Sequence, residues 1–282
     1  IQRPCSGLAE LGEVVGVSRS TSPLALDHTD PVACAALLEE VRPHAVVLCA
    51  ALSSPAECER EPGRAWQANA SSSIVDAVAA FDPSVRFVLL STDQVHNGNG
   101  HLVEEACPAE PINVYGRTKL AMEQLVEAKL PRHAVLRLSF VYGPPARGTH
   151  GTFLQFALDK LRSGAEFTAF TDQVRSAVFV NDVVEAVRLA VEGELAGRVN
   201  VGGPVALSRC DFCRIVAEQC GLPSGGMRSA LSSASPGPVP SPADISMDVS
   251  KLAAALGRSP TSLEQALAEM QLSQSAAIPA KL

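Results

Sequence analysis

A tyrosine and a lysine four positions apart are the residues of this chain best suited to chemistry. Tyr115 is one of only two tyrosines in 282 residues, and Lys119 follows it at a spacing that places both side chains on one face of a helix. A phenol titrates at about pH 10, and a neighbouring ammonium favours the phenolate and lowers that pKa. We expect Tyr115 to exchange a proton with a substrate oxygen. A surface Tyr–Lys pair on a helix would give the same pattern.

Hydroxyl residues at the end of a buried strand lie upstream of this pair. The apolar run 87–90 is followed by Ser91, Thr92 and Asp93. Ligands of doubly wound sheets bind beyond the carboxyl ends of the strands, so a hydroxyl here can bond a substrate carbonyl oxygen. Alone, Ser-Thr-Asp after a strand is more often a turn or a helix cap. Together with Tyr115 and Lys119 it predicts a Ser/Thr–Tyr–Lys catalytic set.

The elements that must position these residues alternate between short apolar strands and helices. Strands that are apolar on both faces and separated by helices predict an α/β fold with a doubly wound parallel sheet. We expect strands at 13–17, 45–49, 86–90, 134–139 and 198–201, and helices at 31–41, 63–81, 115–128, 153–162, 182–191, 208–220, 249–256 and 262–270.

Two units are expected. Residues 1–143, with 178–205 contributing, form the doubly wound domain, and 144–177 with 206–282 form a smaller lobe that contains a Ser/Pro/Gly-rich stretch at 223–242.

Composition excludes several classes of protein. Hydrophobic residues make up 46% and charged residues 19%, which permits a sizeable core and excludes wholesale disorder. The net charge of −7 and the lack of a Lys/Arg-rich run argue against nucleic acid or an anionic membrane as a partner. There is no apolar run of about 18 residues that would span a membrane. The eight cysteines, including Cys210-x-x-Cys213, are expected to pack as small apolar residues, with no metal bound, because no second ligand pair accompanies them.

The motifs resemble those of the extended short-chain dehydrogenase/reductases. Within that family the chain is most similar to the dTDP-4-dehydrorhamnose reductase branch, which also contains the regulatory β subunit of methionine adenosyltransferase. The matching segments are 91–95, 113–121, 136–143, 171–173, 180–182 and 200–204, and 241–248 is similar to plant-type members.

The resemblance implies that residues 1–143 with 178–205 form an NAD(P)-binding Rossmann domain and that the smaller lobe binds the substrate. It also implies roles for individual residues. Tyr115 would be the acid/base, Lys119 its electrostatic partner and a ligand of the nicotinamide ribose, and Thr92 or Ser91 the hydroxyl that orients the carbonyl. Positions that match the cofactor site are Ser18, Arg19, Asp27, Ala50, Ala51, Asn69, Lys119 and Ser139.

Some of these positions have a second interpretation. A basic residue at Arg19, where NAD-binding members carry an acid, suits the 2′-phosphate of NADP(H), although an arginine after a strand is commonplace. Asp27 matches a position near the adenine and equally fits a turn cap. Asn69 also fits a plain polar contact within the fold.

Two departures from the family pattern stand out. The family's opening strand and glycine-rich loop are missing, so we expect the chain, which begins at Ile1, to be N-terminally truncated. Gln94 and His96 occupy positions where the reductases carry Tyr and Phe, which puts the sugar-nucleotide substrate in question.

The predicted function is an NADP(H)-dependent reductase of a 4-keto sugar nucleotide. The alternative is a non-catalytic regulatory subunit that binds the methionine adenosyltransferase catalytic subunit in S-adenosylmethionine biosynthesis, and a cofactor-dependent scaffold is a third interpretation. We expect a cytoplasmic protein, although a targeting peptide ahead of Ile1 would be invisible here.

Overall fold

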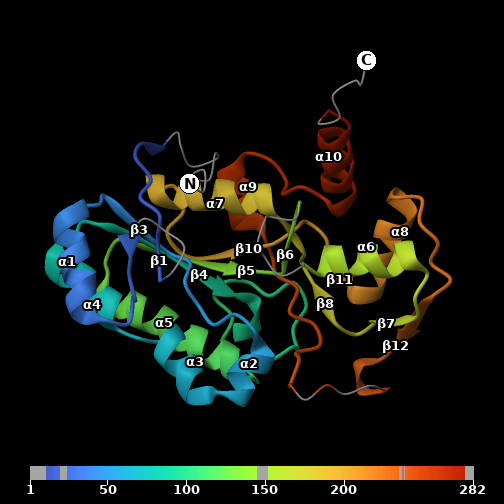
Figure 1. The fold of residues 1–282 in the computed structure, drawn as a ribbon, viewed down its shortest axis with the longest axis horizontal. Helices are drawn as coiled ribbons and strands as arrows, with labels where there is room; N and C mark the ends of the chain where they lie inside the picture. The colour runs from blue at the N-terminus through green and yellow to red at the C-terminus, as the bar shows by residue number, and fades with distance from the viewer. Residues whose placement is uncertain (1–10, 20–23, 145–151, 235–236, 238, 277–282) are drawn as a thin grey trace.

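A four-stranded parallel sheet forms the centre of the computed structural model, which describes residues 11–19, 24–144, 152–234, 237 and 239–276 (Figure 1). The strand order is β10-β5-β4-β3, and every neighbouring pair is parallel. The strands are β3 (Ala45–Leu48), β4 (Arg86–Thr92), β5 (His133–Leu138) and β10 (Gly197–Val201). This sheet confirms the predicted fold class.

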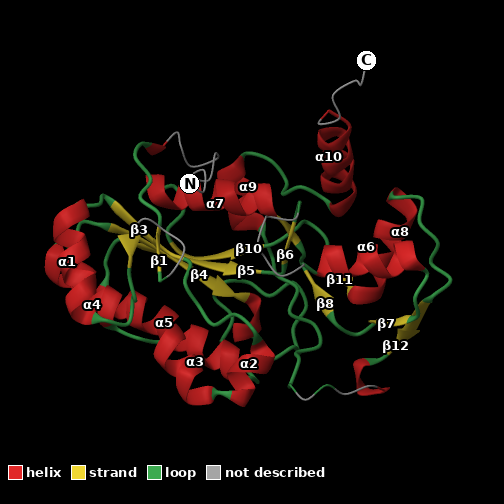
Figure 2. Cartoon of the chain, viewed as in Figure 1, coloured by secondary structure: helices red, strands yellow, loops and turns green. Residues whose placement is uncertain are grey.

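Helices cover both faces of the sheet (Figures 1 and 2). One layer packs around Phe87, Leu89 and Val135, and the other around Val88, Leu136 and Val199. Successive strand residues therefore bury their side chains on opposite faces. The first layer contains α1 (Pro31–Val41), α4 (Ser73–Phe81) and α5 (Val114–Lys129), and the second contains α7 (Val180–Glu192) and α9 (Ser250–Leu256).

A second hydrophobic core lies beyond the carboxyl ends of the strands. Its centre is aromatic, since the ring of Phe212 lies 5.2–5.6 Å from those of Phe140, Tyr142 and Phe153. Cys210 and Cys213 are buried in this core, as expected of small apolar residues. The proposed boundaries of the two units stay a prediction. The elements here are β6 (Val141–Tyr142), α6 (Phe153–Ser163), β7 (Phe167–Phe170), β8 (Val174–Arg175), β9 (Val178–Phe179), β11 (Leu207–Ser208), α8 (Arg209–Gln219), β12 (Met227–Ala230) and α10 (Leu263–Ala276).

No helix within the described ranges is long and apolar enough to cross a bilayer.

Two predicted elements are wrong in part. The strand expected at 13–17 is reduced to β1 (Val17–Ser18), which pairs with β2 (Leu24–Ala25), an element the sequence analysis missed. In the described ranges β3 pairs only with β4. Residues 13–16 therefore have no neighbouring strand in this sheet with which to form backbone hydrogen bonds. The helix expected at 63–81 is interrupted at 70–72 and forms α3 (Pro62–Asn69) and α4, after a short α2 (Pro55–Arg60).

A buried ion pair fixes α5 on the sheet. Glu123 of α5 and Arg137 of β5 are completely buried, and Arg137 Nη2 donates to Glu123 Oε2 at 2.7 Å. Ser91, at the end of β4, donates its hydroxyl to the other oxygen of the same carboxylate. Glu123 therefore joins one helix to two strands, and Tyr115 and Lys119 lie on the same helix face at spacings of four.

Replacing Arg137 tests this anchor. Arg137→Met leaves the Glu123 carboxylate buried without its cation, and breaking a buried pair in this way costs about 3–5 kcal/mol. The measurement is the free energy of unfolding in urea. The control is Arg198→Met, which removes a partly exposed pair with Glu127 and is expected to cost about 0–1 kcal/mol. Equal losses in the two variants would contradict the anchoring role of Glu123.

Candidate active site

A cleft of about 690 Å³ opens beyond the carboxyl ends of β4 and β5. Its volume is in the range of small-molecule sites. It brings together the ends of two strands, the start of α2, the first turn of α5 and the loop at 239–241. Its lining includes Ser91, Thr92, Asp93, Gln94, Tyr115, Ser139, Phe140, Arg175 and Arg209, and we call this space the cleft.

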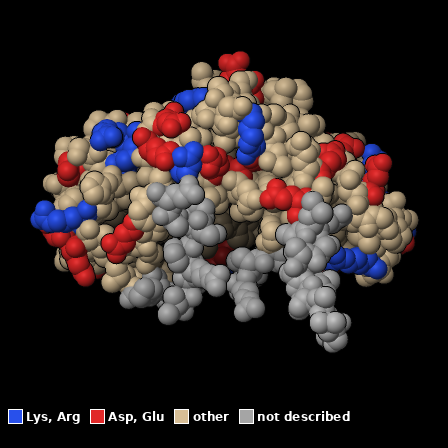
Figure 3. Space-filling view, turned by 90° about the horizontal axis from the view of Figure 1, so that it is seen from above, with Lys and Arg blue, Asp and Glu red and all other residues tan. Residues whose placement is uncertain are grey.

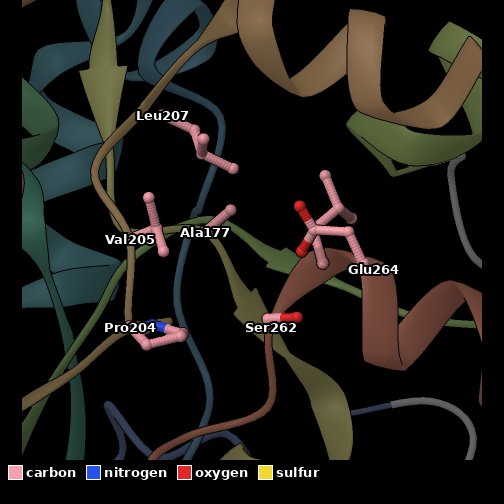
Figure 4. A pocket seen from close by; sticks show the side chains of 7 residues that line it. Ala177, Pro204, Val205, Leu207, Ser262 and Glu264 are labelled. Atoms are coloured by element: carbon pink, nitrogen blue, oxygen red, sulfur yellow. The ribbon is translucent and has the colours of Figure 1, made fainter. Parts of the chain in front are cut away.

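A second hollow lies beside the first turn of α10 (Figure 4). Its volume is only about 30 Å³, and Ala177, Val205, Leu207 and Glu264 are among the residues around it. A space of this size holds little more than water. The cleft is therefore the candidate active site.

The start of α5 is built to bring Tyr115 against the end of β4. Asn113 caps the helix by accepting a hydrogen bond from the backbone N–H of Gly116 at 2.8 Å. A Cβ atom at position 116 would lie 2.2 Å from the carbonyl oxygen of Gln94, so only glycine allows this approach. The close contact places Tyr115 next to Thr92.

The geometry separates the two candidate hydroxyls. Successive residues of a strand point to opposite faces. The Thr92 hydroxyl lies beside the Tyr115 phenol and favours the phenolate, whereas the Ser91 hydroxyl is engaged by Glu123. Both residues line the cleft, but only Thr92 is placed to orient a carbonyl beside Tyr115.

Burial dominates the ionisation of Tyr115. It raises the pKa of the phenol to about 12, against the opposing effect of the Thr92 hydroxyl. The lower pKa expected from the Tyr–Lys spacing is therefore wrong for this state of the protein. Lys119 donates its Nζ to the carbonyl oxygen of Leu90 at 2.7 Å, away from the phenol. At neutral pH Tyr115 is protonated, which is the form that can donate a proton.

Burial also acts on Lys119. Its side chain is almost fully enclosed, and desolvation lowers the pKa of the ammonium to about 8, with Glu123 opposing the shift. Lys119 is therefore charged at neutral pH and loses its charge well before Tyr115 loses its proton.

Two arginines give the far side of the cleft a positive charge. Arg175 is held by the carbonyl oxygens of Pro242 and Ala243. Arg209 stacks against the rings of Phe140 and Phe153, 4.3 Å from each centroid, and burial lowers the pKa of its guanidinium to about 10.

Arg209 has no hydrogen-bond partner for its charge. Its Nη1 is buried and unpartnered within the described residues. Asp93, which accepts from Ser139 at 3.0 Å, attracts both Arg175 and Arg209, but burial raises the pKa of this carboxyl. A buried donor without a partner is costly, so this side of the cleft favours an anion.

Several predicted cofactor residues lie outside the residues that line the cleft. Asp27 is exposed and accepts from Thr29, so it caps a turn. The amide of Asn69 bonds both backbone groups of Leu52 and the hydroxyl of Thr118. Asn69 thus holds the turn after β3 against α5. The others outside the lining are Ser18, Arg19, Ala50, Ala51 and Lys119, and the roles of all these residues with a cofactor stay predictions.

The sequence analysis missed four residues of the site. Glu123 repeats the spacing of four that links Tyr115 to Lys119, a signal that was available. Asn113 stands at the expected cap position before α5. Arg175 and Arg209 follow no local motif, because separate segments of the chain bring them together.

His96 is buried outside the cleft lining, and burial lowers the pKa of its ring to about 4.

The outer surface differs from the cleft. On the face shown in Figure 3, Lys and Arg side chains are interspersed with Asp and Glu among the described residues. The gathered positive charge lies instead inside the cleft, at Arg175 and Arg209.

The chain belongs to the RmlD substrate binding domain family, which it matches over residues 6–275. It is 30% identical over 250 residues to a probable low-salt glycan biosynthesis reductase of Haloferax volcanii, covering 87% of this chain and 83% of that protein. It is 26% identical over 214 residues to the dTDP-4-dehydrorhamnose reductase of Salmonella typhimurium, covering 75% and 72%.

Solved structures share the fold. The dTDP-4-dehydrorhamnose reductase of Bacillus anthracis, solved in complex with NADP, gives a TM-score of 0.79 at 21% identity over 88% of this chain and 87% of that one. The predicted family and the short-chain dehydrogenase/reductase fold are confirmed. The named relatives are reductases, which supports the prediction of an oxidoreductase and gives no support to the alternative of a methionine adenosyltransferase subunit.

The burial of Lys119 leads to a prediction about the stability of the protein. Lys119→Met removes a charge that folding desolvates, so the melting temperature is expected to rise by roughly 2–4 °C at pH 7, the shift that about 1 kcal/mol gives in a chain of this size. The folded pKa of about 8 lies below the ordinary 10.5, so wild-type stability rises with pH between these values. The advantage of the variant is therefore full below pH 8 and shrinks toward pH 10.5.

Melting curves at pH 7 and pH 10 measure this difference. Lys129→Met is the control, because Lys129 lies on the same helix in an exposed pair with Asp76 and is expected to change stability little. A destabilised Lys119→Met protein at pH 7 would show that the lysine is structural.

Proposed function

We propose that the protein is an NADP(H)-dependent reductase of a 4-keto sugar nucleotide. The observation that carries the proposal is the placement of a protonated Tyr115 beside the Thr92 hydroxyl in a cleft whose far side carries the buried Arg175 and the half-buried Arg209. Thr92 would orient the substrate carbonyl, and Tyr115 would donate a proton to its oxygen. The relatives that are reductases of dTDP-4-dehydrorhamnose support this substrate class.

The donor set suits a phosphorylated dinucleotide. Lys119 offers a buried ammonium for the nicotinamide ribose, the turn at Ala50 and Ala51 follows β3, and the exposed guanidinium of Arg19 suits a 2′-phosphate. When bound, the cofactor supplies a hydride to the carbonyl carbon. The chain's own contribution is to hold the carbonyl and to provide the proton.

The positive side of the cleft supports a diphosphate-linked substrate. Arg209 is half-buried, and its Nη1 is buried with no hydrogen-bond partner among the described residues. Arg175, by contrast, donates to the backbone carbonyls of Pro242 and Ala243. An anionic group at Arg209 would satisfy a donor that the protein leaves open. The uncharged sugar would then extend toward Thr92 and Tyr115.

Removing the phenol tests the acid. Tyr115→Phe is expected to lower turnover of a dTDP-4-keto-6-deoxyhexose by about 10²–10⁴-fold, the usual contribution of a positioned acid, with little change in NADPH affinity. Oxidation of NADPH followed by absorbance measures the rate.

The control is Tyr142→Phe, the chain's only other tyrosine. Its hydroxyl is buried outside the cleft lining and has no partner among the described residues, so removing it is expected to leave turnover unchanged. Wild-type turnover in Tyr115→Phe would exclude this residue from the reaction.

Removing the unpartnered arginine tests the diphosphate. A hydrogen bond to a charged group contributes about 1.5–3 kcal/mol, so Arg209→Met is expected to raise KM for the sugar nucleotide by roughly 10- to 100-fold. NADPH affinity should not change. Arg214→Met, an exposed arginine on the same helix, serves as the control. An equal KM in the two variants would place the diphosphate elsewhere.

A further inference from the structure

The amide of Gln94 is held in one orientation at the wall of the cleft. Its neighbour Asn113 is buried and makes three hydrogen bonds: its oxygen accepts from Gly116 N–H at 2.8 Å, and its nitrogen donates to Gln94 Oε1 at 2.8 Å and to the carbonyl oxygen of Pro240 at 3.1 Å. The Gly116 N–H can only donate and the Pro240 carbonyl can only accept. The Asn113 amide therefore cannot be turned over without losing both of its bonds to the backbone.

The fixed polarity of Asn113 determines that of Gln94. Because Asn113 presents an N–H, Gln94 must present its oxygen to it, which leaves the Gln94 NH₂ group with no hydrogen-bond partner among the described residues. The backbone N–H of Gln94 donates to the Thr92 hydroxyl at 3.2 Å, so the residue is tied to the group that faces Tyr115. Gln94 is only half-buried and lines the cleft.

We propose that Gln94 is a specificity-determining residue whose NH₂ group donates a hydrogen bond to a sugar oxygen next to the reacting carbonyl. The inference rests on the proposed function, since it assumes a sugar in the cleft. The ring oxygen of a sugar can accept this bond, whereas a purely apolar ketone has no second oxygen that could. Substrates without such an oxygen would leave the Gln94 donor unpaired and would be rejected.

Two substitutions distinguish this role from a structural one. Gln94→Glu keeps the side-chain length and still accepts from Asn113, but it turns the free end from a donor into an acceptor. Gln94→Met removes both hydrogen-bonding groups. A residue that only supports Asn113 would tolerate Glu and not Met. A residue that donates to the ring oxygen of the sugar, which can only accept, would be harmed most by Glu, because a carboxylate repels that oxygen.

The experiment measures kcat, KM and melting temperature for the wild type and both variants, with NADPH and a dTDP-4-keto-6-deoxyhexose. We expect the melting temperature of Gln94→Glu to lie within about 2 °C of the wild-type value, because a substitution at a half-exposed position changes stability little in a chain of this size. Its KM should rise at least tenfold, about 1.4 kcal/mol. Its NADPH affinity should be unchanged, and Gln94→Met should show a smaller rise in KM.

The outcomes separate the two proposals. Wild-type turnover together with an unchanged KM in Gln94→Glu would overturn the role of Gln94 and leave the reductase function intact. A wild type that binds NADPH but reduces no keto sugar nucleotide would overturn the proposed function and the role of Gln94 with it. A KM that rises in Gln94→Met but not in Gln94→Glu would assign Gln94 a structural role and overturn the specificity proposal.

Discussion

The site depends on one carboxylate that is buried without access to water. Glu123 receives Arg137 from β5 and Ser91 from β4, so a single side chain sets the position of α5 along two neighbouring strands. Taking two charges out of water costs most of what their attraction returns, so such a pair contributes little net stability. Its effect is geometric. Glu123 fixes the helix, and the same helix face carries Lys119 one turn closer to the N-terminus of α5 and Tyr115 two turns closer.

The same burial decides how the site can ionise. Desolvation disfavours charge on either group, so it raises the pKa of the Tyr115 phenol and lowers that of the Lys119 ammonium. At neutral pH the tyrosine keeps its proton and the lysine keeps its charge. Donation of a proton is therefore available without any preparatory step, whereas abstraction would first require the buried phenolate. The state described here is set up for the reduction of a carbonyl.

Local patterns predicted the parts of the site that local chemistry determines. α1 spans the predicted residues 31–41, the apolar run before Ser91 is a strand, and Tyr115 and Lys119 share a helix. The prediction failed where distant segments decide the outcome. The direction of the Tyr115 pKa shift depends on burial by the whole fold, and Arg175 and Arg209 meet only because two distant segments pack together. No local pattern contains that information.

The arrangement of charge across the cleft bears on Arg209, whose Nη1 has no hydrogen-bond partner among the described residues. Arg209 gains contact with two aromatic rings, which offsets part of its desolvation, but Asp93 attracts it without accepting a hydrogen bond from it in the described structure. A protein selected only for stability would place an apolar side chain there. In the empty cleft, the desolvation of Arg209 lowers the stability of the protein. A ligand anion that pairs with Arg209 offsets this loss when it binds. Under the proposed function, the positive side of the cleft would hold the anionic end of the substrate, and the tether between anion and sugar would determine which carbonyl reaches Tyr115.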